Sequence, residues 1–145
     1  MSLRLVPHIH RATHRIGLYL AHLREDGLSQ GEAHILALLA SSGPATIAEL
    51  HRGLAHKRST LTSILDRLAA RGFITREVGA TDRRTFMVTP TGKGASIARR
   101  VHRHLAALET TVLRRVSADE LRGFEKVLLA IEDEAHRQRS LKSEV

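Results

Sequence analysis

A cluster of cationic and hydroxyl side chains fills six of the seven positions from 57 to 63. Guanidinium and ammonium groups pair with phosphate or carboxylate oxygens, and short hydroxyls hydrogen-bond without keeping a neighbouring surface at a distance. This combination suits a helix that closely approaches the base edges and phosphates of duplex DNA. The members of the cluster are Lys57, Arg58, Ser59, Thr60, Thr62 and Ser63.

Further charged residues follow the cluster. We expect Arg67 and Arg76 to contact the sugar–phosphate backbone. Arg83 and Arg84 are expected to enter or flank the minor groove, while Asp82 sets the turn that carries them and holds an arginine.

An apolar stripe must position these residues. Its spacing of i, i+3, i+4 and i+7 predicts a helix that buries one face and turns the hydroxyl and cationic residues outward. The charge of Asp66, on the outward face, opposes phosphate, so we expect it to pair with a basic wing residue, in the first place Arg84. The stripe consists of Leu61, Ile64, Leu65 and Leu68.

The flanking elements complete a helix-turn-helix with a β-hairpin wing. A short helix precedes the stripe and opens at a capping box of Thr46 and Glu49. Two β-type runs, 73–78 and 85–89, surround the charged loop 79–84 and predict a two-stranded hairpin. The polar side of one amphipathic helix is usually only solvated, but packing does not account for basic residues at a hairpin tip nearby. The two features together favour DNA binding.

Composition agrees with a polyanionic partner. The 145 residues suit one domain, and the net charge of +8 gives an isoelectric point near 11.1. Eight basic and three acidic residues lie between positions 51 and 84. The lack of cysteine excludes disulfides and thiolate chemistry. The longest apolar run, 33–40, is too short to span a bilayer, and histidines and arginines interrupt the N-terminal segment, so we expect a cytoplasmic protein without a membrane partner.

The central half of the chain resembles the MarR family of bacterial transcriptional regulators, and the helix order matches over the whole length. The motifs are specific together, although each alone would be weak. The matching segments are Ser59-Thr60-Leu61-Thr62, Leu65-Asp66-Arg67-Leu68, Arg71-Gly72-Phe73-Ile74-Thr75-Arg76, Asp82-x-Arg84 and Val88-Thr89-Pro90-Thr91-Gly92-Lys93-Gly94.

The resemblance implies a two-fold homodimer of triangular outline that binds duplex DNA. It places a winged helix-turn-helix lobe at 28–94 and helical dimerisation regions at 3–26 and 91–138. Two residues depart from the family pattern. Lys57 stands where a Ser or Thr cap is usual, and His56 replaces a small apolar residue in the turn. Lys57 cannot accept a backbone N–H, so the helix start is either looser or capped by another group.

The outer helices carry apolar residues at alternating spacings of three and four, which is the pattern of a helix–helix seam. Packing within one chain is the alternative, but we favour a dimer interface. Capping boxes at Ser29/Glu32 and Ser117/Glu120 open two helices, and the residues after Arg137 look frayed. The stripes are Val6, Ile9, Thr13, Ile16, Leu20 and Leu23; Ile97, Val101, Leu105, Leu108, Val112 and Val116; and Leu121, Phe124, Leu128, Ile131 and Ala135.

The first helix also bears cationic residues beside its seam. MarR-like proteins often bind small aromatic acids in a crevice near the dimer helices, and this helix offers donors and one aromatic wall to such an effector. Solvation, or pairing with an acid such as Glu109, is the alternative. The candidate ligand residues are His10, Arg11, His14, Arg15 and Tyr19.

Metal binding and catalysis find little support. His10 and His14 have the i, i+4 spacing that zinc can use, but no cysteine or nearby carboxylate completes a ligand set. No nucleotide, hydrolase or metalloprotease motif occurs, so we expect no enzyme, metal or cofactor.

We therefore interpret the chain as a mainly α winged helix-turn-helix homodimer, a ligand-responsive repressor that binds a pseudo-palindromic operator. One alternative is a winged-helix protein-interaction module without DNA binding, against which the basic wing residues Arg83 and Arg84 argue. The other is a metal-responsive regulator, which zinc would stabilise.

Overall fold

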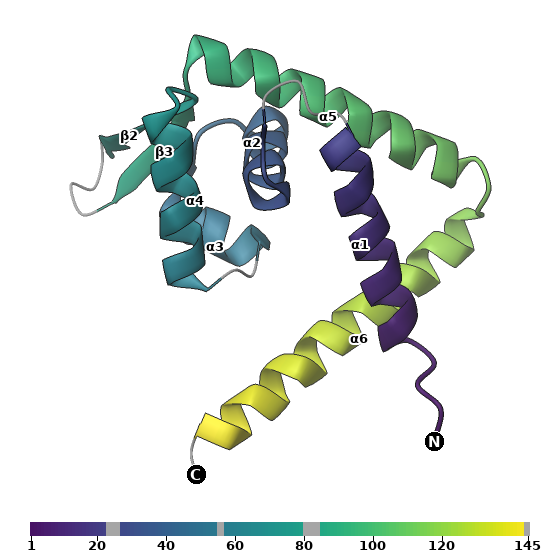
Figure 1. Ribbon diagram of the computed structural model, residues 1–145. Coiled ribbons are helices and arrows are strands. Elements are labelled where there is room, and N and C mark those ends of the chain that lie inside the picture. The colour runs from purple at the N-terminus through teal and green to yellow at the C-terminus, as the bar shows by residue number, and fades with distance from the viewer. Residues whose placement is uncertain (23–26, 55–56, 80–84, 144–145) are drawn as a thin grey trace. The chain divides into compact units, whose positions relative to one another are not determined.

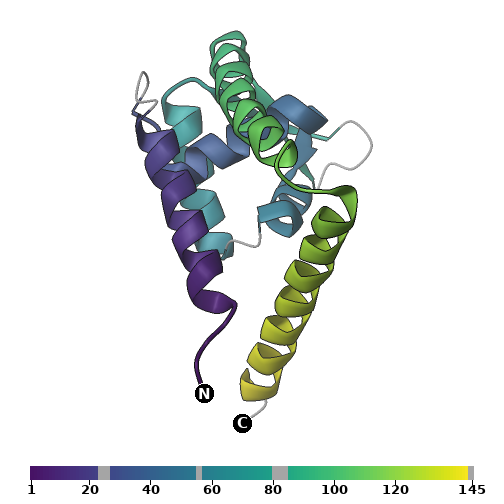
Figure 2. The same cartoon turned by 90° about the vertical axis from the view of Figure 1, so that its right-hand side faces the viewer.

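The computed structural model describes residues 1–22, 27–54, 57–79 and 85–143 (Figures 1 and 2). They belong to two compact units, Met1–His104 and Leu105–Val145. The elements are α1 (Val6–His22), α2 (Gln30–Ser42), β1 (Ala45–Thr46), α3 (Ile47–Leu54), α4 (Arg58–Ala70), β2 (Ile74–Val78), β3 (Phe86–Pro90), α5 (Gly92–Leu113) and α6 (Ala118–Ser143). The expected mainly α winged-helix fold is confirmed.

The sheet has one strand more than the sequence predicted. Its order is β1-β3-β2, and all pairings are antiparallel. β2 and β3 form the expected wing, whereas β1 pairs Ala45 with Val88 and Thr46 with Met87. A two-residue strand is too short to show alternation of apolar and polar residues, so periodicity gave no signal for it.

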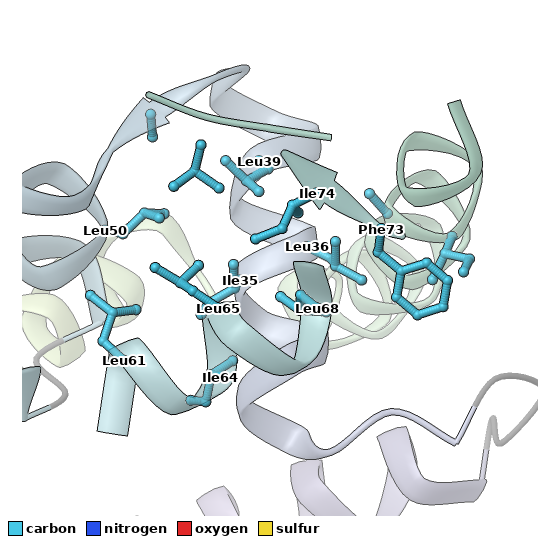
Figure 3. Packing of buried hydrophobic residues seen from close by; sticks show 14 residues of the cluster. Ile35, Leu36, Leu39, Leu50, Leu61, Ile64, Leu65, Leu68, Phe73 and Ile74 are labelled. Carbon is cyan, nitrogen blue, oxygen red and sulfur yellow. The ribbon is translucent and has the colours of Figure 1, made fainter. Parts of the chain in front are cut away.

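The core of the first unit lies between α2, α4 and the sheet (Figure 3). All four stripe residues of α4 are buried, which confirms the predicted inward face. Ile35, Leu36 and Leu39 of α2 pack against them, and Phe73, Ile74 and Val88 join from the turn and the wing strands. The other members of the cluster are Ala45, Leu50, Ile97 and Ala98. This apolar packing fixes which face of α4 remains in solvent.

Two of the three predicted capping boxes are complete. At α3, Thr46 N–H donates to Glu49 Oε2 over 2.8 Å, and Glu49 N–H donates to Thr46 Oγ1 over 3.2 Å. Ser117 and Glu120 exchange the same pair of hydrogen bonds at α6.

The third box forms only in half. Ser29 Oγ accepts from Glu32 N–H at the start of α2, over 3.2 Å. The Glu32 carboxylate does not complete the expected box, because it binds two arginines instead.

α5 begins at Gly92, two residues after the end of β3. Position 90 still belongs to β3, and Thr91 caps the helix by accepting from Gly94 N–H over 3.0 Å. The Thr91 hydroxyl also donates to Gly72 O over 2.6 Å, which ties the helix start to the turn after α4.

The second unit contains the end of α5 and all of α6. The prediction that α6 frays after Arg137 was wrong, because the helix continues to Ser143. Glu134 accepts hydrogen bonds from Arg137 and Gln138 on the same helix, which holds the last turns together without apolar packing.

Candidate nucleic-acid interface

The six clustered residues lie together at the N-terminal half of α4, and all are exposed. Lys57 is the N-cap residue, in an extended conformation with φ −60° and ψ 146°, and its side chain makes no capping hydrogen bond. The Lys57 side chain therefore does not cap the start of α4. Thr62 Oγ1 donates to Arg58 O over 2.9 Å, so its oxygen lone pairs remain available to a donor.

A hollow of about 540 Å³ lies beside this face, between the start of α3, the first turns of α4 and the start of β3. His51, Arg52, Arg58 and Thr62 bring cationic, imidazole and hydroxyl groups to its lining. Its lining residues are Thr46, Ile47, Ala48, His51, Arg52, Arg58, Leu61, Thr62, Thr85 and Phe86.

One edge of the α4 face is tied to the wing. Arg76 Nη1 of β2 pairs with Asp66 Oδ1 over 2.8 Å, and both side chains are partly exposed. Asp66 therefore pairs with a basic wing residue, as expected, but the described partner is Arg76. Arg84, the partner expected first, lies outside the described residues with Asp82 and Arg83.

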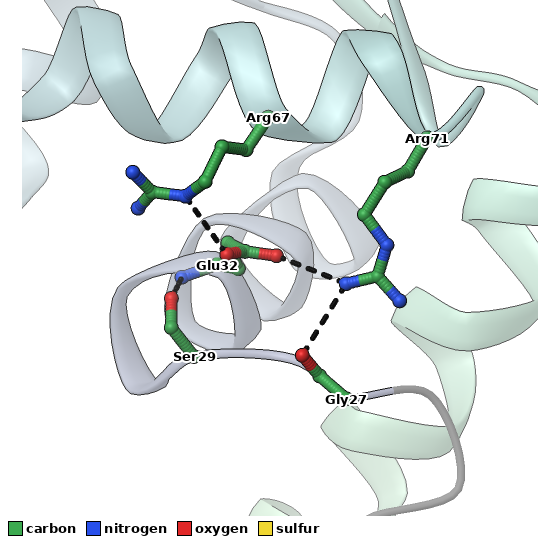
Figure 4. A network of polar contacts seen from close by, with 5 residues as sticks. All are labelled: Gly27, Ser29, Glu32, Arg67 and Arg71. Atoms are coloured by element: carbon green, nitrogen blue, oxygen red, sulfur yellow. Dashed lines mark hydrogen bonds and ion pairs between the residues drawn. The ribbon is translucent and has the colours of Figure 1, made fainter.

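The opposite edge is tied to α2 (Figure 4). Glu32 is buried, and its side chain is only 6% exposed. Arg67 Nε lies 3.2 Å from Glu32 Oε1, and Arg71 Nη1 lies 3.3 Å from Glu32 Oε2 and 3.4 Å from Gly27 O. A buried carboxylate is stable when charged donors satisfy both of its oxygens, as they do here.

The Glu32 carboxylate was expected to complete a capping box, and its two arginine partners were not predicted. The spacing of Arg67 and Arg71, i and i+4 on one helix edge, was the only available signal. It does not identify a partner 35 residues away.

The candidate ligand residues lie on α1, as predicted. His10, Arg11, His14 and Arg15 are exposed along the helix. The Tyr19 hydroxyl donates to His104 O over 3.2 Å, which joins α1 to α5 within the first unit. The structure therefore aligns four of these groups in solvent and gives the fifth a structural contact.

A second basic feature lies on α5, away from the predicted site residues. A hollow of about 420 Å³ is lined by Ala40, Ser96, Arg99, Arg100, His102 and Arg103.

Among the residues that the structure describes, no three His, Asp or Glu side chains are grouped so that they could hold a metal ion. No helix in the described ranges is both long and apolar enough to cross a membrane.

Comparison with known proteins connects this geometry to one family. A sequence model of the MarR family matches residues 28–86. The multiple antibiotic resistance protein MarR of Salmonella typhimurium is 31% identical over 98 residues, covering 67% of this chain and 68% of that protein. An HTH-type transcriptional repressor of Mycobacterium tuberculosis is 28% identical over 120 residues, covering 79% of this chain and 86% of the repressor.

A solved structure supports the fold independently. Staphylococcus aureus MepR in its DNA-binding conformation has a TM-score of 0.81 with this chain at 17% identity, covering 92% of this chain and 99% of MepR. At that identity the likeness shows the fold alone.

Proposed function

This chain belongs to the MarR family, and we propose that it is a repressor that binds a pseudo-palindromic DNA operator as a homodimer. The exposed face of α4 carries this proposal. Two cations and four short hydroxyls stand in solvent there, above four buried apolar residues that fix the helix on the core. Such a face fits the major groove, where hydroxyls read base edges and cations bind phosphate.

The other predicted DNA contacts extend this face. Arg67 and Arg76 flank it and would bind the DNA backbone. Asp82, Arg83 and Arg84 would form the wing tip, with the two arginines in or beside the minor groove.

A second copy of the chain would cover apolar side chains of the outer helices. Within the predicted stripes, Leu20 and Ile97 are buried inside the first unit, whereas Val6 of α1 and Phe124 of α6 are 58% and 55% exposed. Side chains of this size on helices with seam spacing support a helical dimer interface.

Footprinting and binding of duplex DNA test the proposal. The parent should protect two half-sites about one helical turn apart, roughly 34 Å. Arg58→Ala should weaken binding: evenly on all sequences if Arg58 contacts phosphate, or by about 1–3 kcal/mol with relaxed specificity if it contacts a base. Arg99→Ala is the matched control, because it removes an exposed arginine of α5 outside this face.

Two results would overturn the proposal. If the parent binds no duplex DNA at any salt concentration, the chain is better explained as a protein-interaction module. Equal loss in the two variants would mean that net charge, and not the α4 face, governs binding.

We further propose that a small aromatic acid regulates the repressor through α1. Arg11 and Arg15 would pair with its carboxylate, His10 and His14 would donate further hydrogen bonds, and Tyr19 would contact its ring. The two exposed arginines and two exposed histidines along α1 support this assignment.

A further inference from the structure

We propose that Glu32 is a positioning residue for DNA recognition, which holds Arg67 so that the outer part of its guanidinium faces a DNA phosphate. The inference rests on the proposed function, because Arg67 can act in this way only if α4 binds duplex DNA. Glu32 lies on α2 and faces the interior, and in this role it contributes to the affinity of α4 for DNA.

The position of Arg67 on α4 fits this role. Thr60, Ser63 and Arg67 follow one another at spacings of three and four, so they form the edge of the exposed face that lies towards α2. At 52% exposure, the Arg67 side chain reaches both the buried carboxylate and solvent.

Different nitrogens of the Arg67 guanidinium can bind different partners. Its Nε–H donates to Glu32, and in Figure 4 the two terminal nitrogens lie on the side away from the carboxylate. Those nitrogens can donate two parallel hydrogen bonds to phosphate oxygens, the arrangement that distinguishes arginine from lysine. Glu32 therefore uses the nitrogen that a bidentate phosphate contact leaves free.

Burial makes Glu32 effective as an anchor. Water screens the exposed pair Asp66–Arg76, whereas the Glu32 carboxylate is nearly excluded from solvent. Arg71 binds the other oxygen, so each oxygen of the buried carboxylate has a charged partner. A donor fixed before binding loses less conformational freedom when DNA arrives.

For loss of the Glu32 charge, the inference predicts a change in DNA affinity opposite to the one that simple electrostatics predicts. Removing a negative charge from a DNA-binding surface should strengthen binding, because the field around the phosphates becomes more favourable. If Glu32 positions Arg67, Glu32→Gln should instead weaken binding severalfold, since the amide keeps the size of the side chain and loses the charge.

Four variants test this sign: Glu32→Gln, Arg67→Gln, Arg71→Gln and the double variant Glu32→Gln/Arg67→Gln. Affinity for duplex DNA is measured over a series of salt concentrations, with thermal unfolding of each variant. Arg67→Gln should reduce the salt slope by about 0.9, the contribution of one phosphate contact. Glu32→Gln should move the slope in the same direction and should have no further weakening effect in the double variant.

Arg71→Gln is the matched control, because it removes the other arm of the same carboxylate. It should lower the unfolding temperature and leave the salt slope unchanged. Equal slope changes in Arg71→Gln and Arg67→Gln would show a general structural effect and refute the inference. Tighter binding by Glu32→Gln would refute it as well.

The experiment separates this inference from the proposed function. If Arg67→Gln leaves the slope unchanged while Arg58→Ala still weakens binding, the inference fails and the DNA-binding function stands. If the parent binds no duplex, the proposed function fails.

Discussion

Gly94, in the first turn of α5, lies where the helix passes closest to the turn that follows α4. A Cβ at this position would overlap the carbonyl group of Phe73. The close approach belongs to the same junction in which Thr91 bonds Gly72 O and caps α5. Glycine here lets the wing strands and the long helix meet on one core.

Gly94→Ala should therefore destabilise the protein, by about 1–3 kcal/mol, because the backbone of one element must move away from the other. Gly92→Ala is the control two residues earlier, where a Cβ would meet open space. It should be neutral or slightly stabilising, since alanine favours helix more than glycine does. Urea unfolding of both variants measures the difference, and similar midpoints for the two would contradict the close contact.

Individual residues differed in how far the sequence revealed their role. Gly94 stands in a motif that matches the family, so its importance could be predicted, although the Phe73 carbonyl could not. The Ser29 half of the capping box follows from local spacing, because both partners lie within one turn. The predicted partner of the Glu32 carboxylate was wrong, because tertiary packing decides whether it binds the α2 N-terminus or the two arginines of α4.

At the level of elements, α3 depends on its capping box more than the longer helices do, because it has only eight residues. The backbone N–H of Thr46 holds the pKa of Glu49 below its ordinary value, with further lowering by the Thr46 hydroxyl and by the charge of Arg52. A depressed carboxyl pKa means that the charged form favours the folded state.

The stability that Glu49 contributes to the folded state decreases in acid. The stabilisation by Glu49 is fully present above the carboxyl pKa of the unfolded chain, and is lost as pH falls through the lower pKa of the folded state. Glu49→Gln should shift the urea midpoint downward at neutral pH and should match the parent in strong acid, where both side chains are neutral. A difference that persists unchanged in strong acid would rule out the charge as its source.

Elements with strong periodicity were predictable, and short or context-dependent ones were not. The apolar stripe predicted α4 and its inward face, because four residues at helical spacing define a face by themselves. β1 exists only because Val88 and Met87 of β3 offer it a partner. The last turns of α6 are polar and have no apolar pattern, so the predicted helix ended too early. Hydrogen bonds from Arg137 and Gln138 to Glu134 hold these turns together.

For the whole molecule, the two units differ in their packing. The first has a closed apolar core, whereas α6 of the second has no buried side chain among its described residues and leaves Phe124 and Leu129 in solvent. Seam spacing had marked Phe124 as part of an apolar stripe. The proposed DNA-binding face lies on α4, and the surface proposed for a second copy lies on the outer helices. In this proposal an effector alters the spacing of two recognition helices without touching either.

Titration of the protein–operator complex with salicylate tests this regulation. Release should occur because the acid prefers a dimer whose recognition helices are wrongly spaced, and it requires unequal affinity for the two states. Arg15→Ala should need more salicylate for the same release, while DNA affinity without salicylate stays unchanged. Equal release in the parent and the variant would exclude Arg15 from the effector site.

The bond between Glu32 and Arg67 also limits how much DNA affinity a transplanted α4 would carry to a relative. A chimera that receives only Arg58–Ala70 acquires the arginine without its anchor, because Glu32 lies on a helix left behind in the donor. Such a chimera should bind every duplex more weakly than one that also receives α2, because a phosphate contact contributes to affinity on all sequences. Full affinity would then require α2 together with α4.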